Sequence, residues 1–161
     1  MNPFILSSGN NLFVTFLASF LIWFMVAGII YLWISDAKIK IKHVVEIFLA
    51  TLVAFIITEL IKKAFPTLRP FEVNGRVPLT LTIPIDPSFP SEHTSLAFAL
   101  ATGIRRFGKK HFFLYLGFAL LVGVGRLLSN VHYFLDIIAG AIIGIISVLM
   151  LEKVKIIKLL R

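Results

Sequence analysis

The sequence predicts an all-α protein, a polytopic bundle of transmembrane helices, and three observations predict this class. Of the 161 residues, 58% are apolar and 15% are charged, whereas soluble domains carry about 25% charged residues. The apolar residues gather in blocks of helical length. The basic residues fall in short runs between those blocks. Together these features indicate one membrane domain over residues 1–161.

The net charge of +8 is compatible with nucleic-acid binding, but basic runs placed between apolar blocks are typical of membrane topology. We therefore expect no nucleic-acid partner. The chain contains no cysteine, which excludes disulfides and thiolate chemistry.

The first predicted span runs from Leu12 to Ile34, 23 residues without a charged side chain. At 1.5 Å per residue it is long enough to cross about 30 Å of hydrocarbon. It is too long for the apolar part of a signal peptide and no basic residue precedes it, so we expect it to be retained. Tyr31 and Trp33 near its end suit a membrane interface.

Four further spans are predicted at about residues 44–63, 89–105, 112–128 and 132–151. The third contains the shortest apolar block. The connection before it, residues 64–89, is the one long loop, and six of the seven prolines lie between residues 66 and 90. Because this loop is also rich in apolar residues, we expect an ordered cap on the membrane face.

The distribution of basic residues predicts the orientation of the chain. Eleven of the sixteen lie after the first, third and fifth spans: Lys38, Lys40, Lys42, Arg105, Arg106, Lys109, Lys110, Lys153, Lys155, Lys158 and Arg161. The positive-inside rule places these regions in the cytoplasm, so the N-terminus lies outside and the C-terminus inside a cell (inner or plasma) membrane. Their simplest roles are topology and contact with anionic lipid headgroups at the inner face.

Five basic residues fall at the opposite, outer end: Lys62, Lys63, Arg69, Arg76 and Arg126. Pro66 disfavours helix at the residue before it, so the second span should stop there and the chain should turn over the membrane surface. Lys62 and Lys63 can snorkel from the helix end or pair with Glu59 at helical spacing. For Lys62 and Arg69, binding of an anionic ligand is the open alternative.

Pro90, Ser91, Glu92 and His93 open the third span. Proline suits the first turn of a helix, and the free N–H groups of that turn attract anions. The plainer alternative is that Ser88 or Ser91 only caps the helix and that His93 is only an interfacial histidine.

Arg126 ends the fourth span, and the tight link Ser129-Asn130-Val131 leads to His132 at the start of the fifth. Asp136 follows four residues later, so the two side chains share a helical face and should interact. An aspartate within an apolar span is costly and usually functional.

Small residues on two spans indicate close packing of the third span against the fifth: Ser95, Ala99, Gly103, Gly140 and Gly144. We therefore expect His93 and His132 to face one pocket. Three cations fit a phosphate dianion. A histidine oriented by a carboxylate is an activated base or nucleophile, and a second histidine can protonate a leaving oxygen.

Three sequence elements resemble those of the type 2 phosphatidic acid phosphatase family of integral membrane lipid phosphatases. They are K-x6-R-P (Lys62, Arg69, Pro70), P-S-x-H (Pro90, Ser91, His93) and R-x5-H-x3-D (Arg126, His132, Asp136). The resemblance implies hydrolysis without metal or other cofactor through a phosphohistidine. His132 would be the nucleophile, Asp136 its orienting partner and His93 the general acid. Lys62, Arg69, Ser91 and Arg126 would hold the phosphoryl oxygens.

Two positions depart from the family pattern: Glu92 replaces the usual glycine and Gly125 the usual serine. The acidic residue at position 92 resembles the pattern of the undecaprenyl-diphosphate phosphatase branch of this family. Glu92 can serve structurally by pairing with Arg76 or Lys63, or it can raise the pKa of His93. Family members commonly have six spans, whereas five are predicted here.

The favoured function is hydrolysis of a phosphate or diphosphate headgroup of a lipid at the outer membrane face. Undecaprenyl diphosphate is the preferred substrate, and lipid A 1-phosphate and phosphatidylglycerol phosphate are the alternatives. A non-enzymatic protein that binds or translocates lipid headgroups would explain the cations. It would not explain His93 or the pairing of His132 with Asp136. A metal site is not expected, because the outer face offers two histidines and few acids.

Overall fold

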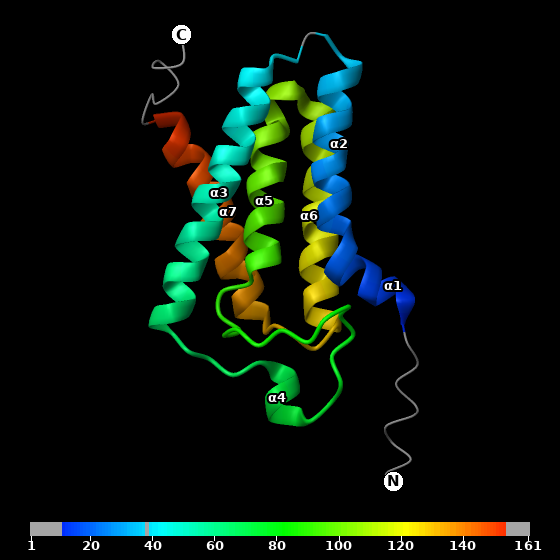
Figure 1. Ribbon diagram of the computed structural model, residues 1–161, viewed down its shortest axis with the longest axis vertical. Helices are drawn as coiled ribbons and strands as arrows, with labels where there is room; N and C mark the ends of the chain where they lie inside the picture. Colours follow the sequence, from blue (N-terminus) through cyan, green and yellow to red (C-terminus); the bar gives the residue numbers. More distant parts are fainter. Residues whose placement is uncertain (1–10, 38, 154–161) are drawn as a thin grey trace.

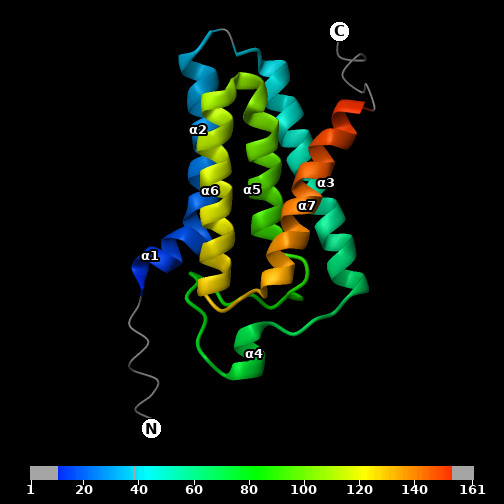
Figure 2. The ribbon, with the colours of Figure 1, turned by 180° about the vertical axis from the view of Figure 1, so that it is seen from behind.

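The computed structural model describes residues 11–37 and 39–153 and confirms the predicted all-α bundle (Figure 1 and Figure 2). The elements in chain order are α1 (Leu12–Thr15), the π-helical η2 (Phe16–Phe20), α2 (Leu21–Ser35), α3 (Ile41–Ala64), α4 (Pro70–Asn74), α5 (Glu92–Gly103), the 3-10 helix η3 (Ile104–Phe107), α6 (Lys109–Leu128) and α7 (Phe134–Lys153). Helix α3 ends at Ala64, directly before Phe65, as the position of Pro66 predicted.

Among the described residues, four helical stretches are long and apolar enough to cross a membrane: Leu12–Ser35, Ile41–Ala64, Lys109–Leu128 and Phe134–Lys153. Four of the five predicted spans are therefore long and apolar enough to cross a membrane. The exception is the predicted span 89–105, whose bounds are corrected, because residues 89–91 stay outside α5 and the chain tightens into η3 after Gly103.

Helix α5 nevertheless runs along the bundle between α3 and α6 (Figure 1). Nine of its twelve residues are buried, because α3, α6 and α7 all pack against it. A helix enclosed by protein in this way needs no apolar surface for lipid. Its length and hydropathy are therefore a poor guide to its place in the fold.

Glycines on α7 allow a close approach to α5. A Cβ on Gly140 would lie 2.5 Å from the Ser91 carbonyl oxygen, and one on Gly144 would overlap the Ser95 carbonyl oxygen. The predicted packing of these two helices is confirmed. Gly103, expected in the same stripe, instead faces α3, where its Cβ would lie 2.9 Å from Ile47 Cγ1.

The bundle separates the basic residues into two groups. The basic end of the bundle holds the α2–α3 and α5–α6 connections and the end of α7 (Figure 2). It carries Lys40, Lys42, Arg105, Arg106, Lys109, Lys110 and Lys153. The motif end, where α3 and α6 end and α5 and α7 begin, carries Lys62, Lys63, Arg69, Arg76 and Arg126. The predicted cations Lys38, Lys155, Lys158 and Arg161 lie outside the described residues.

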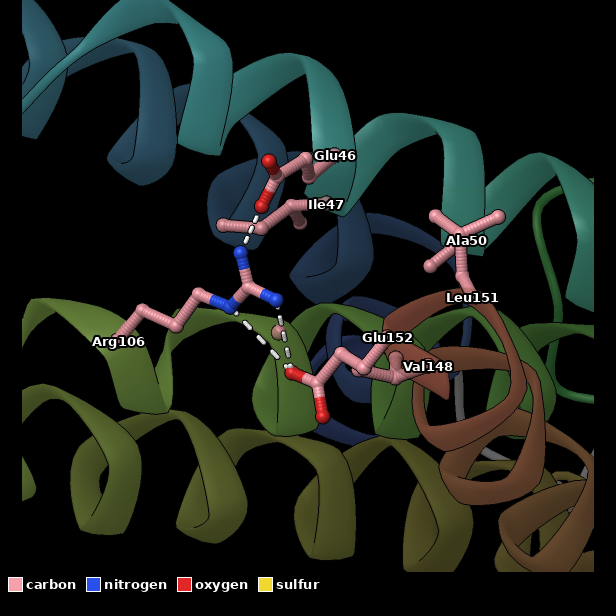
Figure 3. A pocket seen from close by; sticks show the side chains of 8 residues that line it. Glu46, Ile47, Ala50, Arg106, Val148, Leu151 and Glu152 are labelled. Carbon is pink, nitrogen blue, oxygen red and sulfur yellow. Dashed lines mark hydrogen bonds and ion pairs between the residues drawn. The ribbon is translucent and has the colours of Figure 1, made fainter. Parts of the chain in front are cut away.

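Ion pairs join three helices at the basic end (Figure 3). Arg106 pairs with Glu46 of α3, and its Nη2 lies 3.1 Å from Glu152 Oε1 of α7. Arg105 also pairs with Glu152. A buried carboxylate such as Glu46 needs a nearby cation, so these two arginines serve packing within the protein as well as any contact with lipid. The pocket between these side chains is only about 10 Å³.

The chain between α3 and α5 forms a cap over the motif end, with α4 at its outermost point (Figure 1). Backbone hydrogen bonds tie it to the α6–α7 link and to itself. Phe71 N donates to Asn130 O at 3.1 Å, and Leu79 N donates to Ser129 O at 3.0 Å. Ser88 N donates to Thr67 O at 3.0 Å. The cap therefore has a defined path across the helix ends.

Candidate active site

A cavity of about 370 Å³ lies at the motif end, beneath the cap. Six of the eight residues singled out from the sequence line it: Lys62, Arg69, Glu92, His93, Arg126 and His132. Ser91 and Asp136 do not line it. Further lining residues come from the first helical stretch and from the cap: Ser19, Trp23 and residues 80–86.

The guanidinium of Arg69 is fixed largely by backbone carbonyls. Its Nε donates to Asp86 O at 2.8 Å, and its Nη1 donates to Val131 O at 3.0 Å. Glu72 caps α4 by accepting a hydrogen bond from the Arg69 backbone N at 2.6 Å. Pro70 fits the first turn of α4. The R-P pair therefore places a rigid cation, 1% exposed, at the cavity wall.

Arg126, at the end of α6, reaches across to the first helical stretch. Its Nη1 donates to Ala18 O at 3.2 Å. Within the described part of the chain its buried Nε has no hydrogen-bond partner, so one donor is free for a ligand. The neighbouring Gly125 explains one departure from the family pattern, since a Cβ there would lie 2.7 Å from Leu17 Cβ and 2.8 Å from Ala18 N.

His132 lies where the two arginines meet. Its Nε2 is 3.3 Å from Arg69 Nη1 and 3.4 Å from Arg126 Nη2. Guanidinium groups only donate, so Nε2 must be the unprotonated nitrogen. Burial, opposed in part by the hydrogen bond to Asp136, lowers the pKa of His132 to about 4. The ring is therefore neutral near pH 7, with its lone pair beside two cations.

Asp136 sits behind His132, and its Oδ2 lies 3.4 Å from His132 Nδ1. The expected contact is present, but its expected geometry is corrected. Helix α7 begins at Phe134, so His132 precedes the helix and does not lie on its face. The same Oδ2 accepts a hydrogen bond from Tyr133 N at 2.8 Å. This bond stabilises the turn before α7, which places the His132 imidazole next to Asp136.

Ser88 is a site residue that the sequence reasoning treated only as a possible cap. Its hydroxyl donates to Asp136 Oδ2 at 2.5 Å and lies 3.5 Å from His132 Nδ1. Both Ser88 and Asp136 are buried. The hydroxyl thus helps to orient the carboxylate that faces His132.

Ser91, expected to contact phosphate, is fully buried and points elsewhere. Its hydroxyl lies 3.0 Å from Thr94 Oγ1, and its backbone N donates to Asp136 O at 3.0 Å. Ser91 therefore supports the start of α5. His93, two residues on, lines the same cavity as His132, as expected.

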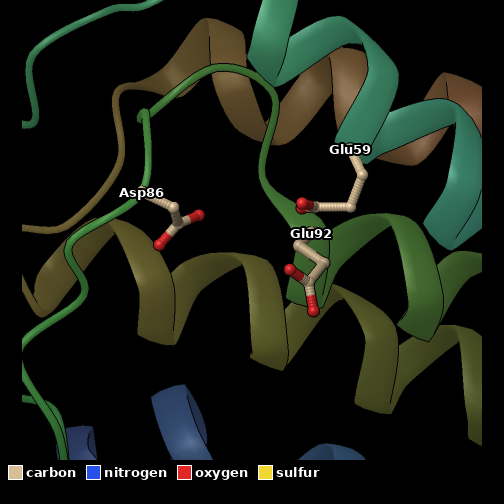
Figure 4. Close-up of side chains that lie close together, drawn as sticks. All are labelled: Glu59, Asp86 and Glu92. Atoms are coloured by element: carbon tan, nitrogen blue, oxygen red, sulfur yellow. The ribbon is translucent and has the colours of Figure 1, made fainter.

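Lys62 is surrounded by three carboxylates, whose side chains Figure 4 shows converging. It pairs with Asp86, and its Nζ lies 3.9 Å from Glu59 Oε1 and 3.9 Å from Glu92 Oε2. The expected partners of Glu92, Arg76 and Lys63, are therefore corrected to Lys62. Sequence periodicity gave no signal for Asp86, because it lies in the irregular cap.

Glu59, Asp86 and Glu92 also form a group of acids that could hold a metal ion. The sequence reasoning expected few acids here. The ammonium of Lys62 lies within 4 Å of all three, so the protein already supplies a cation to this group. Although burial opposes it, the hydrogen bond and charge of Lys62 hold the pKa of Asp86 below its ordinary value.

Known proteins resemble this chain in sequence and in fold. A family model described as the PAP2 superfamily matches residues 43–155. The bacitracin transport permease protein BcrC of Bacillus licheniformis is 34% identical over 139 residues, which are 86% of this chain and 68% of that protein.

Two solved structures are similar throughout the chain. The crystal structure of Aquifex aeolicus LpxE has a TM-score of 0.71 and 26% identity, and the match covers 95% of this chain and 88% of that one. The PAP2-type phosphatidylglycerolphosphate phosphatase from Bacillus subtilis has a TM-score of 0.64 and 18% identity, over 96% of this chain and 78% of that one. The latter likeness is one of fold.

Proposed function

Because the chain belongs to the PAP2 superfamily of membrane lipid phosphatases, we propose that it hydrolyses a lipid phosphate or diphosphate through a phosphohistidine on His132. The chain is a multi-pass membrane protein. The observation that carries the mechanism is the environment of the imidazole. Its unprotonated Nε2 faces Arg69 and Arg126 at 3.3 and 3.4 Å, and its Nδ1 faces Asp136.

In the first step, His132 Nε2 attacks phosphorus and the bond from phosphorus to the leaving oxygen breaks. Lys62, Arg69 and Arg126 hold the phosphoryl oxygens and stabilise the charge that develops on them. The carboxylate of Asp136 stabilises the positive charge that the ring acquires.

His93 then protonates the leaving oxygen. A bound phosphate dianion favours the protonated form of this imidazole, because opposite charges attract. In the second step His93 takes a proton from water, the water oxygen attacks phosphorus, and the bond to Nε2 breaks. Inorganic phosphate leaves and His132 is restored.

For orientation, we propose that the motif end faces the exterior or periplasm and the basic end the cytoplasm. The charge distribution supports this, because the predicted loops of the basic end carry most of the Lys and Arg residues. The N-terminal segment expected on the outer face lies outside the described residues, apart from Asn11.

Undecaprenyl diphosphate is the substrate we propose first. Glu92 supports this choice, because the undecaprenyl-diphosphate phosphatase branch that the sequence resembles also has an acidic residue at this position. Trp23, Leu81 and Ile83 add apolar surface to the cavity wall, which suits the first units of a lipid chain. The alternative substrates are phosphatidylglycerol phosphate, which the name of the Bacillus subtilis phosphatase contains, and lipid A 1-phosphate.

The test is phosphate release by purified protein from a panel of lipid phosphates and diphosphates, compared by kcat/KM. We expect turnover of at least one lipid and none by His132→Ala. A protein that binds these lipids without releasing phosphate would instead be a headgroup-binding or translocating protein. That second candidate is supported by the name of BcrC, which describes transport.

A further inference from the structure

The carboxylate of Asp86 bridges two of the cations assigned to phosphate. Its Oδ2 pairs with Lys62 Nζ, and its Oδ1 lies 3.0 Å from Arg69 Nη2. The side chains of Lys62 and Arg69 are 3% and 2% exposed, whereas that of Asp86 is 40% exposed. Buried cations are costly without an anion, and the exposed partner is the one free to leave.

We propose that Asp86 is an intramolecular competitor of phosphate, which holds Lys62 and Arg69 in the empty site and is displaced by the phosphoryl group of the substrate. Its two oxygens bridge the cations as two phosphoryl oxygens would. After hydrolysis the carboxylate returns to the cations and opposes retention of inorganic phosphate. The inference rests on the proposed function only in assigning these cations to phosphate.

The cations do not depend on this carboxylate for their positions. Arg69 keeps its bonds to the backbone carbonyls of Asp86 and Val131, at 2.8 and 3.0 Å. Lys62 keeps its ion pairs with Glu59 and Glu92, in which Nζ lies 3.9 Å from Glu59 Oε1 and from Glu92 Oε2. Removing the charge of Asp86 should therefore free the two cations and leave them in place.

The backbone of the cap segment that carries Asp86 is held in place, since Arg69 Nε donates to the Asp86 carbonyl oxygen at 2.8 Å, so displacement requires only the Asp86 side chain to turn away. The segment is anchored on one side by Leu79 N, which donates to Ser129 O, and on the other by Ser88 N, which donates to Thr67 O. Between these anchors, Leu81 N donates to Ser19 Oγ at 3.2 Å.

The test is the affinity of the full-length protein for inorganic phosphate, measured without turnover. Trp23 lines the cavity and Trp33 is the only other tryptophan, so titration in a Trp33→Phe background reports on the site through Trp23 fluorescence. We expect Asp86→Asn to bind phosphate about tenfold more tightly or better, since a charged hydrogen-bonding competitor has gone. The inhibition constant of phosphate should fall in parallel.

Glu59→Gln is the matched control. It removes one negative charge from the same group, but Glu59 does not bridge the two cations, so the dissociation constant should stay within about threefold of the parent value at fixed ionic strength. Asp86→Ser is a second charge-free variant, in case Asp86→Asn does not fold.

Unchanged or weaker phosphate binding in the charge-free Asp86 variants would overturn the inference, because it would make Asp86 a positioning residue for the cations. An equal gain in Glu59→Gln would overturn it too, since general electrostatics would then be the cause. The proposed function is tested separately by lipid turnover. A parent protein that binds phosphate but releases none from lipids contradicts that function and leaves the titration informative.

Discussion

His132 Nδ1 lies 3.4 Å from Asp136 Oδ2, although His132 precedes the helix that carries Asp136. The carboxylate also accepts the backbone N–H of Tyr133, so the turn before α7 and the imidazole share one acceptor. Arg69 and Arg126 on the opposite edge of the ring leave Nε2 only the role of acceptor. Backbone, carboxylate and cations thus fix a single tautomer of His132.

Asp136→Asn should fold and bind lipid but lose turnover. The amide cannot stabilise the imidazolium and can favour the wrong tautomer, and the loss in related arrangements reaches about 10⁴-fold in kcat. Steady-state kinetics and a thermal melt measure the two effects. A kcat within a few-fold of the parent value would remove Asp136 from the mechanism.

Ser88→Ala should lower kcat by roughly 10- to 100-fold, since it removes a buried hydrogen bond to the orienting carboxylate. KM should change less than kcat, because Ser88 does not line the cavity. Ser147→Ala is the control: its buried hydroxyl bonds to Ile143 O at 2.8 Å within α7, away from the site, and activity should persist. Equal losses in both variants would point to general destabilisation.

Glu92→Gln and Glu92→Gly should keep substantial activity, because Glu92 is one of three carboxylates around Lys62. The alkaline limb of the kcat/KM profile should stay where it is. If Glu92 instead stabilises the protonated form of His93, that limb will move to lower pH in both variants.

Activity should persist in excess EDTA, since the proposed steps use histidines and fixed cations. The carboxylates of Glu59, Asp86 and Glu92 make this a real test, because they form a potential metal group. Complete loss of activity that a single divalent ion restores would require a different mechanism.

The orientation can be tested by single-cysteine labelling, which is clean because the chain has no cysteine. Arg76→Cys lies in the cap, and Lys110→Cys lies near the start of α6 at the basic end. An impermeant reagent should label intact cells at position 76 and not at position 110. The reverse pattern would invert the proposed topology. A cysteine near position 5 should also be labelled, although that position lies outside the described residues.

The sequence predicts the site best where the functional residues lie at a fixed separation along the chain. Arg126, His132 and Asp136 were assigned to one site from their separation, and the structure brings all three together. The stop of α3 followed from Pro66 alone. These inferences succeed because helix periodicity and proline sterics are local.

Sequence reasoning failed where contacts join irregular segments. Asp86 and Ser88 reach the site from the cap, whose path no hydrophobic period encodes. Helix α5 was expected to span residues 89–105, yet it is surrounded by protein and shorter. The direction of the Ser91 hydroxyl, toward Thr94, likewise depends on packing that the motif does not specify.

The first helical stretch carries none of the motif residues, and it precedes the family match at residue 43. Even so, Ala18 accepts a hydrogen bond from Arg126, Ser19 accepts one from the cap at Leu81, and Trp23 lines the cavity. A fragment that began at α3 would keep all the residues of the proposed chemistry but lose the side wall against which they are set. We therefore expect the smallest catalytically competent unit to be larger than the segment that the motifs define, and a transplant of the site to another bundle to require this helix.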